Sequence, residues 1–261
     1  MHILFIGDIV GSPGREAVKE LLPELKKEQN LQFVIANAEN AAGGSGITQK
    51  VAEELFDSGV DVMTSGDHIW KKREILEFIE QEERILRPLN FPSGAPGRGF
   101  GIFKTKDGLK VGVINVNGRV FMEALECPFR TTLAAVEAVS NQTNIIIVDI
   151  HAEATSEKVA LGWYLDGKVS AILGTHTHIQ TADERILPQG TAYLTDAGMT
   201  GPYDSVIGRK IEDVLGRFLT LIPVRFEVAK ENIQLHGAVL DIDEKTGKAR
   251  AIVRIQKKLN G

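Results

Sequence analysis

Side chains that can bind metal ions follow the apolar stretches of this 261-residue sequence repeatedly. Asp8 comes directly after HILFIG, and His151 comes directly after NIIIVDI. Because the carboxyl ends of parallel strands meet at one edge of an α/β sheet, we expect such side chains to converge despite their separation in the sequence. The eight residues placed in this way are Asp8, Glu39, Asn40, Asp67, His68, His151, His176 and His178.

This mixture of carboxylates, imidazoles and an amide is larger than one structural zinc ion needs. Structural zinc sites also usually recruit cysteine, and the single cysteine, Cys127, lies outside the set. Four of the six histidines belong to it. A two-metal centre with open coordination positions, of the kind that activates water for hydrolysis, fits these residue types better.

Each of these residues also has an ordinary structural interpretation. An aspartate at a strand end, such as Asp8, is commonly a cap or turn residue. His176 and His178 would share one face if they stood in a strand, although an isolated H-x-H arises easily by chance. Asn40 can simply anchor its loop. The recurrence of the pattern after five strands is what favours a shared site.

Other motifs with catalytic associations give weaker signals. The segments GSPG at 11–14 and GGSG at 43–46 resemble phosphate-binding loops, but neither is followed by the lysine and hydroxyl of a Walker sequence. We expect their glycines, which lack side chains, to let the backbone pass close to the metal site. The first segment can also offer helix N–H groups to a phosphate. The sequence has no G-x-S-x-G elbow, which disfavours a serine hydrolase.

The elements that must position these residues are a series of short apolar strands. In the first half of the chain, strands are predicted at 2–6, 33–36 and 60–64. Helices alternate with them, one beginning at Ser12 and Pro13 and one after the cap Thr48, which predicts parallel βαβ units. The second half is rich in strands, with a hairpin around 106–108 and further strands at 144–150, 169–174, 191–195, 223–229, 232–241 and 250–256. We therefore expect two packed sheets with helices outside.

The length favours one domain spanning residues 1–261. Between residues 87 and 101, four glycines and three prolines in fifteen positions indicate a structured loop. We place a small cap-like insertion there, at roughly 87–130.

The composition excludes several classes of protein. A net charge of −5 without a basic block argues against a broad nucleic-acid-binding surface. The apolar runs are too short for a membrane span, and the start of the chain reaches Asp8 too early for a signal peptide. With one cysteine there is no intramolecular disulfide. These features predict a cytoplasmic protein. No apolar interface stripe stands out in the sequence, so it does not decide whether the protein forms a homo-oligomer.

Long stretches of the sequence resemble the bacterial YmdB phosphodiesterase family, one of the calcineurin-like metallophosphoesterases. The resemblance covers nearly the whole chain and depends on the motifs MHILFIGDIVGSPGR, NAENAAGGSGIT, RPLNFP, VDIHAEATSEKVALGW and GTHTHIQTADERILPQGTAYLTDAGMTGPYD. It implies a four-layer αββα sandwich with a small cap. It also implies metal-dependent hydrolysis of phosphodiesters, including 2′,3′-cyclic nucleotides.

The resemblance also implies a role for each candidate residue. One metal ion would be held by Asp8, Glu39, Asn40 and His178. A second ion would be held by Glu39 as a bridging ligand, Asp67, His151 and His176. His68 would stand beside the ions as a general acid or as a donor to the phosphate. The family typically has asparagine where this chain has Asp67, which keeps an oxygen ligand but changes the charge of the cluster.

The expected function is hydrolysis of a small phosphodiester, most simply a nucleotide, by a hydroxide that bridges two transition-metal ions. Mixed oxygen and nitrogen ligands favour iron or manganese, with zinc as the alternative. Two other interpretations stay open: phosphomonoester or phosphoprotein hydrolysis in the same site, and a metal-dependent regulatory binding protein with residual hydrolysis. The sequence does not identify the substrate-binding residues.

Overall fold

A computed structural model describes residues 1–259, which form two β-sheets and six α-helices. The helices are α1 (Gly11–Glu28), α2 (Gln49–Asp57), α3 (Ile75–Gln81), α4 (Pro128–Ser140), α5 (Thr155–Leu165) and α6 (Ile211–Thr220), with a short 3-10 helix η1 (Ile69–Lys71). The strands are β1 (His2–Ile6), β2 (Asp8–Ile9), β3 (Leu31–Asn37), β4 (Val62–Thr64), β5 (Phe100–Lys104), β6 (Lys110–Asn117), β7 (Ile146–His151), β8 (Ala171–Thr175), β9 (Arg185–Ile186), β10 (Ala192–Leu194), β11 (Met199–Pro202), β12 (Ile233–Ile242) and β13 (Ala249–Lys258). Within these residues, no helix combines the length and apolarity that crossing a membrane requires.

Both sheets contain a run of parallel strands. The first sheet has the order β2-β11-β12-β1-β3-β4, with β13 paired to β12, and its β1, β3 and β4 are parallel. The second sheet has the order β5-β6-β7-β8-β10-β9, and its β6, β7, β8 and β10 are parallel. The predicted βαβ units are confirmed. Strand β1 also takes an antiparallel partner from far along the chain, because Ile3 pairs with Leu240 on β12.

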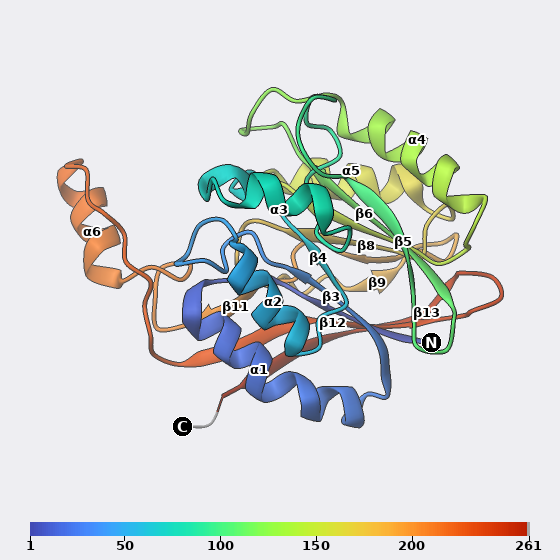
Figure 1. Cartoon of the computed structure of the whole chain (residues 1–261), viewed down its shortest axis with the longest axis horizontal. Coiled ribbons are helices and arrows are strands. Elements are labelled where there is room, and N and C mark those ends of the chain that lie inside the picture. Colours follow the sequence, from blue (N-terminus) through green and yellow to red (C-terminus); the bar gives the residue numbers. More distant parts are fainter. Residues whose placement is uncertain (260–261) are drawn as a thin grey trace.

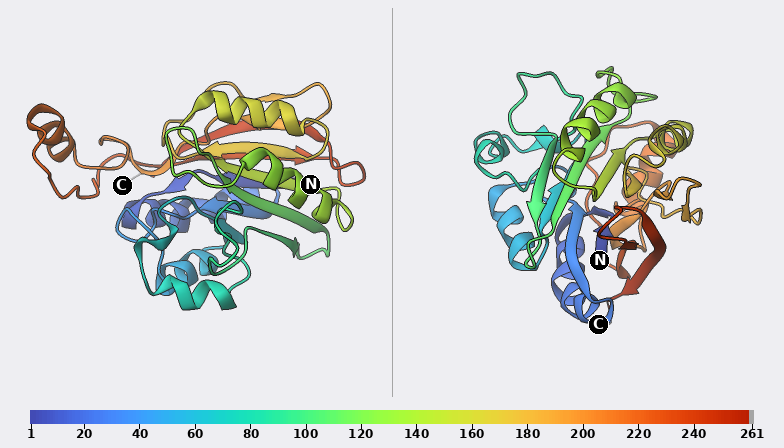
Figure 2. Two further views of the ribbon diagram at one scale, coloured as in Figure 1. Left: turned by 90° about the horizontal axis from the view of Figure 1, so that it is seen from above. Right: turned by 90° about the vertical axis from the view of Figure 1, so that its right-hand side faces the viewer.

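The alternation of side chains along the strands divides the core into three apolar layers. On β1, Leu4 and Ile6 pack with residues of α1 and α2, whereas Ile3 and Phe5 face the second sheet. A third layer lies between the second sheet and helices α4 and α5. Figure 2 shows α1 and α2 on one outer side of the sheets and α5 on the other. The expected four-layer αββα sandwich is confirmed.

The stretch 87–130 belongs partly to the body of the fold. Its β5 and β6 form the predicted hairpin and lie at one edge of the second sheet. The loops on either side of this hairpin lie outside the sheets, and their action as a cap stays a prediction.

A different segment, residues 203–231, projects from the sandwich and carries α6 (Figure 1). We call this segment the arm. The strand predicted at 223–229 is wrong, because the arm offers no neighbouring strand and only a single bridge joins Val228 to Arg209. The start predicted for α1 is also slightly wrong: the helix begins at Gly11, so Ser12 lies inside its first turn instead of capping it.

Candidate metal centre

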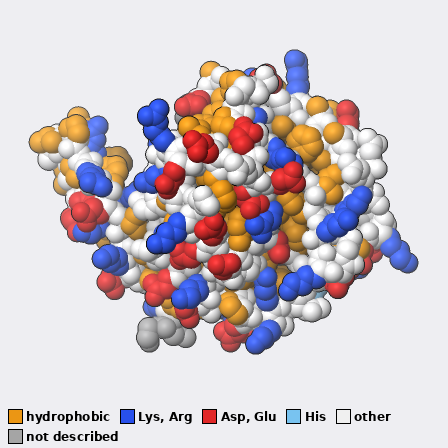
Figure 3. Space-filling model, in the orientation of Figure 1, with side chains coloured by type: hydrophobic (Ala, Val, Ile, Leu, Met, Phe, Trp, Pro, Cys, Tyr) orange, Lys and Arg blue, Asp and Glu red, His pale blue; other side chains and the backbone are white. Residues whose placement is uncertain are grey.

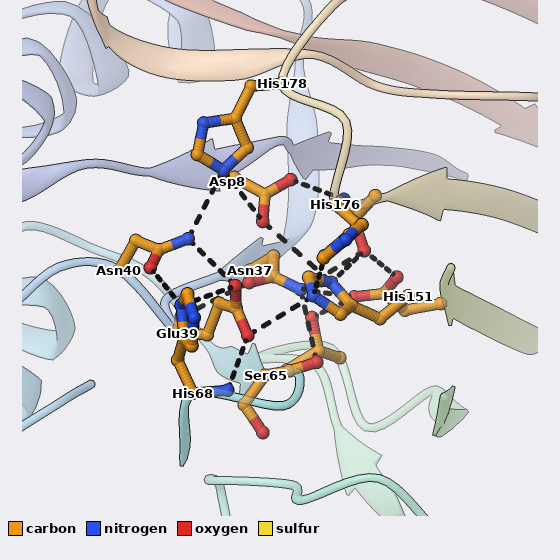
Figure 4. A network of polar contacts seen from close by, with 12 residues as sticks. Asp8, Asn37, Glu39, Asn40, Ser65, His68, His151, His176 and His178 are labelled. Carbon is orange, nitrogen blue, oxygen red and sulfur yellow. Dashed lines mark hydrogen bonds and ion pairs between the residues drawn. The ribbon is translucent and has the colours of Figure 1, made fainter. Parts of the chain in front are cut away.

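All eight candidate residues lie at or just after the carboxyl ends of strands. Those that Figure 4 labels converge on one site from both sheets. The first sheet supplies Asp8 after β1, Glu39 and Asn40 after β3, and Asp67 and His68 after β4. The second sheet supplies His151 at the end of β7 and His176 and His178 after β8. The convergence inferred from the strand ends is thus present, and it joins the two sheets.

Four of the residues form one compact group with the chemistry of a metal site. Glu39, Asp67, His151 and His176 each offer a ligand atom, and these atoms lie within 4.8 Å of one another. His151 Nε2 lies 3.3 Å from Glu39 Oε2 and 3.3 Å from Asp67 Oδ1. His176 Nδ1 lies 3.6 Å from the same oxygen of Asp67. We call these four residues the first group.

Asp8, Asn40 and His178 form a second group beside the first. Asp8 Oδ1 lies 3.8 Å from His178 Nε2. Asn40 Nδ2 donates to Glu39 Oε1 at 2.8 Å and lies 3.3 Å from His178 Nε2. Because the two oxygens of Glu39 face different groups, this carboxylate is placed to bridge them.

The amide of Asn40 has its nitrogen, and not its oxygen, toward the second group. Asn40 Oδ1 instead faces His68 Nδ1 at 2.9 Å. Glu39 Oε1 and His178 Nε2 are both acceptors and lie near each other. The NH₂ group of Asn40 lies between them and offers a donor to each. For Asn40 to bind a cation through oxygen, its amide would turn over.

Two buried oxygens test whether these residues fit a cation. Asp8 Oδ1 and Asp67 Oδ1 have no hydrogen-bond partner among the described residues. A buried carboxylate oxygen without a donor is costly, and a metal ion is the partner that compensates it. Three carboxylates and three imidazoles around these atoms are a donor set for a transition metal. The residues present therefore fit the ions that the family resemblance implies.

The pKa values of the carboxylates reflect a competition between burial and nearby charge. Burial raises the pKa of Asp8 to about 6. Burial also acts on Glu39, but the charge and hydrogen bond of His151 outweigh it and lower the pKa to about 2. His151 shows the reciprocal effect, because Glu39 and Asp67 overcome its burial and raise its pKa above the usual value. The carboxylates therefore favour a positively charged partner beside them, which is the protonated ring of His151 or, in its place, a metal ion bound at Nε2.

Close packing leaves room in the centre only because residue 66 is glycine. A Cβ at Gly66 would lie 2.2 Å from both Glu39 Oε2 and His151 Nε2. Any larger residue there would occupy the space between the ligand atoms.

His176 and His178 are held in an unusual backbone conformation. As expected from the strand predicted at 169–174, both residues follow the end of β8 at Thr175, so they do not share a strand face, and their φ values are 98° and 65°. Non-glycine residues with positive φ concentrate at functional sites, where the surroundings hold them. The holding contact is Asp196, which accepts hydrogen bonds from the backbone and hydroxyl of Thr177 between them.

Asp196 is itself held by a buried ion pair. Lys158 Nζ donates to Asp196 Oδ2 at 2.7 Å, and each side chain is about 1% exposed. Neither residue was among the sequence candidates. A lysine inside a helix and an aspartate in a loop have no local signal, and only the fold brings them together.

Glu39 and His176 of the first group and Asn40 and His178 of the second form the floor of a cavity of about 990 Å³. His68 lines this cavity, and its backbone amide donates to Glu39 Oε2 at 3.2 Å. The opposite wall belongs to the arm and consists of the apolar side chains Ile207, Val214, Phe218 and Phe226 with Arg209 and Arg217. Hydrophobic side chains gather on this arm in Figure 3. This wall was not predicted from the sequence, although Val214 and Phe218 have the i, i+4 spacing of one helix face.

A four-layer αββα sandwich with carboxylates and histidines at its strand ends is the arrangement of the calcineurin-like metallophosphoesterases. The sequence also matches the family of YmdB-like proteins over residues 4–255. The chain belongs to this family.

Relatives and solved structures agree with that assignment. A Bacillus subtilis protein called 2′,3′-cyclic-nucleotide 2′-phosphodiesterase is 52% identical over 98% of this chain and 96% of its own length. A putative phosphatase/phosphodiesterase of Mycoplasma genitalium is 37% identical over 98% of this chain and 92% of its own. A crystal structure described as a novel phosphatase from Mycoplasma pneumoniae is 35% identical, covers 99% of this chain and 93% of its own, and has a TM-score of 0.92.

Proposed function

We propose that this protein is a metal-dependent phosphodiesterase and that 2′,3′-cyclic nucleotides are its substrates. The observation that carries the proposal is the first group of ligand atoms within 4.8 Å, with the unpaired Asp67 Oδ1, at the floor of an open cavity. The name of the Bacillus subtilis relative supports the substrate class.

We propose two ions for each chain, one for each group, with Glu39 between them. Iron or manganese suits the mixed ligands, and zinc is the alternative. Bound metal ions would make a water molecule nucleophilic and neutralise charge on the phosphate oxygens. The protein contributes by holding the ligands rigidly: the backbone amide of His176 donates to Asp8 Oδ2 at 3.0 Å, which fixes this carboxylate.

His68 is our candidate for the general acid. It lines the cavity, is about one-third exposed, and follows a ligand candidate instead of belonging to either group. Its Nδ1 donates to Asn40 Oδ1 in the present orientation, and it would accept from Nδ2 once that amide turned over to bind a cation. In both cases the ring is held and Nε2 is the nitrogen available for proton transfer. A proton from Nε2 to the departing oxygen completes the cleavage of the diester.

The arm supports a nucleotide as the substrate. Its apolar wall faces the polar floor across the cavity, so a base can pack against Phe218 or Phe226 while the phosphate lies on the floor. The cavity volume of about 990 Å³ is at the upper end of the range for small-molecule sites. We place the reaction in the cytoplasm, since the single cysteine is free.

Initial rates with Mn²⁺ on three substrates test this function. We expect hydrolysis of 2′,3′-cyclic AMP and bis-p-nitrophenyl phosphate, with slower hydrolysis of the monoester p-nitrophenyl phosphate. A faster rate on the monoester would favour a phosphatase, the other activity named for the Mycoplasma relatives. Background rates on all three substrates would overturn the proposal in favour of a regulatory binding protein. Elemental analysis after reconstitution should find about two ions for each chain, and one or none would contradict the dinuclear centre.

A further inference from the structure

Asp149 is a fully buried carboxylate that the proposed reaction does not use. It lies on β7, two residues before His151, and is 0% exposed. Three side chains donate to it: Thr175 Oγ1 to Oδ1 at 2.7 Å, and Thr64 Oγ1 and Asn37 Nδ2 to Oδ2 at 2.5 and 3.0 Å. Asn37 and Thr64 belong to the first sheet and Thr175 to the second. Asp149 is therefore surrounded by donors and acts as an acceptor toward all of them.

The direction of these bonds settles the role of the Thr175 hydroxyl. A threonine hydroxyl has one proton and two lone pairs. The proton of Thr175 goes to Asp149 Oδ1, so its oxygen accepts from any further partner. Its two lone pairs face Asn37 Nδ2 at 3.3 Å and, in a shorter bond, His151 Nδ1 at 2.9 Å. The bond therefore requires a proton on Nδ1 of His151.

The same bond decides which nitrogen of His151 can bind a metal. With Nδ1 protonated, Nε2 of the neutral imidazole has a free lone pair. Nε2 is the atom that lies 3.3 Å from Glu39 and 3.3 Å from Asp67, inside the first group. The ring is 0% exposed, so no water molecule from the cavity replaces the contact at Nδ1.

We propose that Asp149 and Thr175 are positioning residues that form a hydrogen-bonded relay, which fixes the tautomer and orientation of His151 and presents its Nε2 to the metal. Histidine ligands commonly have such a supporting partner, whose loss lowers metal affinity by about 10–100-fold. The relay extends the proposed metal centre from the cavity floor into the space between the two sheets.

A matched pair of valine substitutions separates positioning from simple packing. Thr175→Val and Thr64→Val each remove one hydroxyl that donates to Asp149, but only Thr175 contacts His151. The measurement is the affinity of the full-length protein for Mn²⁺ and Zn²⁺, by competition with a chelator. We expect Thr175→Val to lose about 10–100-fold in affinity and Thr64→Val to lose less than about 3-fold. Both should lower the melting temperature of the metal-free protein by similar amounts.

Two further variants test the direction of the relay. Thr175→Ser keeps the hydroxyl and should restore the affinity to within about 3-fold of the wild type. Asp149→Asn can turn an NH₂ group toward Thr175, which would send the hydroxyl proton toward His151 and move the imidazole proton to Nε2. We expect it to weaken metal binding as Thr175→Val does.

The ¹⁵N spectrum of the zinc-loaded wild type gives a readout that is independent of affinity. It should show His151 protonated at Nδ1. Protonation at Nε2, or equal affinities of the two valine variants, would overturn the relay while leaving the metal centre intact. A wild-type protein that binds neither metal would overturn the metal centre and the relay together.

Discussion

The floor and the wall of the cavity are built in opposite ways. The floor and the ligand candidates packed behind it are polar side chains at strand ends, of which Asp8, Glu39 and His151 are at most 1% exposed. The wall is carried by the arm, where Phe218 is 75% exposed and Phe226 is 40% exposed. The floor residues are held mainly by contacts from the two sheets, with one bond to the arm, from His178 Nδ1 to the carbonyl of Ile207 at 2.9 Å. The wall depends on local contacts of one projecting segment. The difference separates the chemistry, which the whole fold maintains, from selectivity, which can change with the arm alone.

The attachment of the arm illustrates this contrast. Near the cavity, the Arg209 guanidinium of the arm donates a hydrogen bond to the carbonyl of Gly44. Lys210 and Glu227 form an ion pair within the arm itself. Exposed pairs of this kind add little to stability. Substitutions in the floor should therefore affect metal binding and turnover, and substitutions in the wall should affect the choice of substrate.

The largest effect should come from Glu39→Gln, which weakens the contact to both groups at once. We expect metal affinity to fall by more than the roughly 10–100-fold that loss of a supporting residue costs, and hydrolysis to fall to background. Elemental analysis and initial rates measure the two effects. If Glu39→Gln kept both ions and full activity, Glu39 would not be the bridging ligand.

The next effect concerns His68→Ala. This variant should keep its metal ions but lose turnover by about 10²–10⁴-fold, the usual range for a general acid. The loss should shrink for nitrophenyl leaving groups, which need little protonation. Equal losses for nitrophenyl and alkyl leaving groups would instead indicate that His68 positions the phosphate.

Asp67→Asn should shift the pH dependence of the reaction. Burial tends to raise the pKa of Asp67, but His151, whose Nε2 lies 3.3 Å away, lowers it below its usual range, so the carboxylate is charged at working pH. Removing this negative charge makes the centre more positive, which favours ionisation of the attacking water. The acid limb of the pH–rate profile should therefore move to lower pH, by about one unit.

This comparison needs Mn²⁺ in both proteins and a verified metal content, because a trivalent ion in the wild type would offset the charge of Asp67. Coincident acid limbs, or a shift of the variant to higher pH, would mean that Asp67 does not bind the metal as a charged ligand.

The smallest effect should come from the wall. Phe226→Ala should raise KM for 2′,3′-cyclic AMP by about 10-fold, within the range for loss of one base-stacking contact. Its kcat on methyl p-nitrophenyl phosphate, which has no base, should be unchanged. Leu219→Ala is the matched control, because Leu219 is an exposed apolar residue of α6 outside the cavity lining. An equal effect of Phe226→Ala on both substrates would erase the proposed division between floor and wall.

The convergence of the floor residues was predictable from the sequence, because parallel strands bring their carboxyl ends to the same edge of a sheet whatever their order in it. Short apolar runs before Asp8, Glu39, Asp67 and His151 therefore indicated the convergence without knowledge of the strand order in the sheets. The four layers followed from the same alternation of apolar strands and helices.

The rest depended on contacts that have no local signal. The turn of His176 and His178 is held by Asp196 from another loop, and the orientation of the Asn40 amide depends on its neighbours. The pattern at 223–229 alternates like a strand, yet Val224 and Phe226 remain about 40% exposed because no strand lies beside them. An alternating apolar pattern indicates which side chains favour burial, but it does not indicate which other element of the fold would bury them.

The pairing of β1 with β12 has a consequence for the order of events during synthesis. Strand β1 leaves the ribosome long before its antiparallel partner β12, which begins only at Ile233. At about 5–20 residues per second, this strand waits roughly 10–50 s for its partner. Long-range pairings of this kind also slow folding itself. We therefore expect Asp8, which follows β1 after Gly7, to reach its final place late, and metal loading to follow the synthesis of β12.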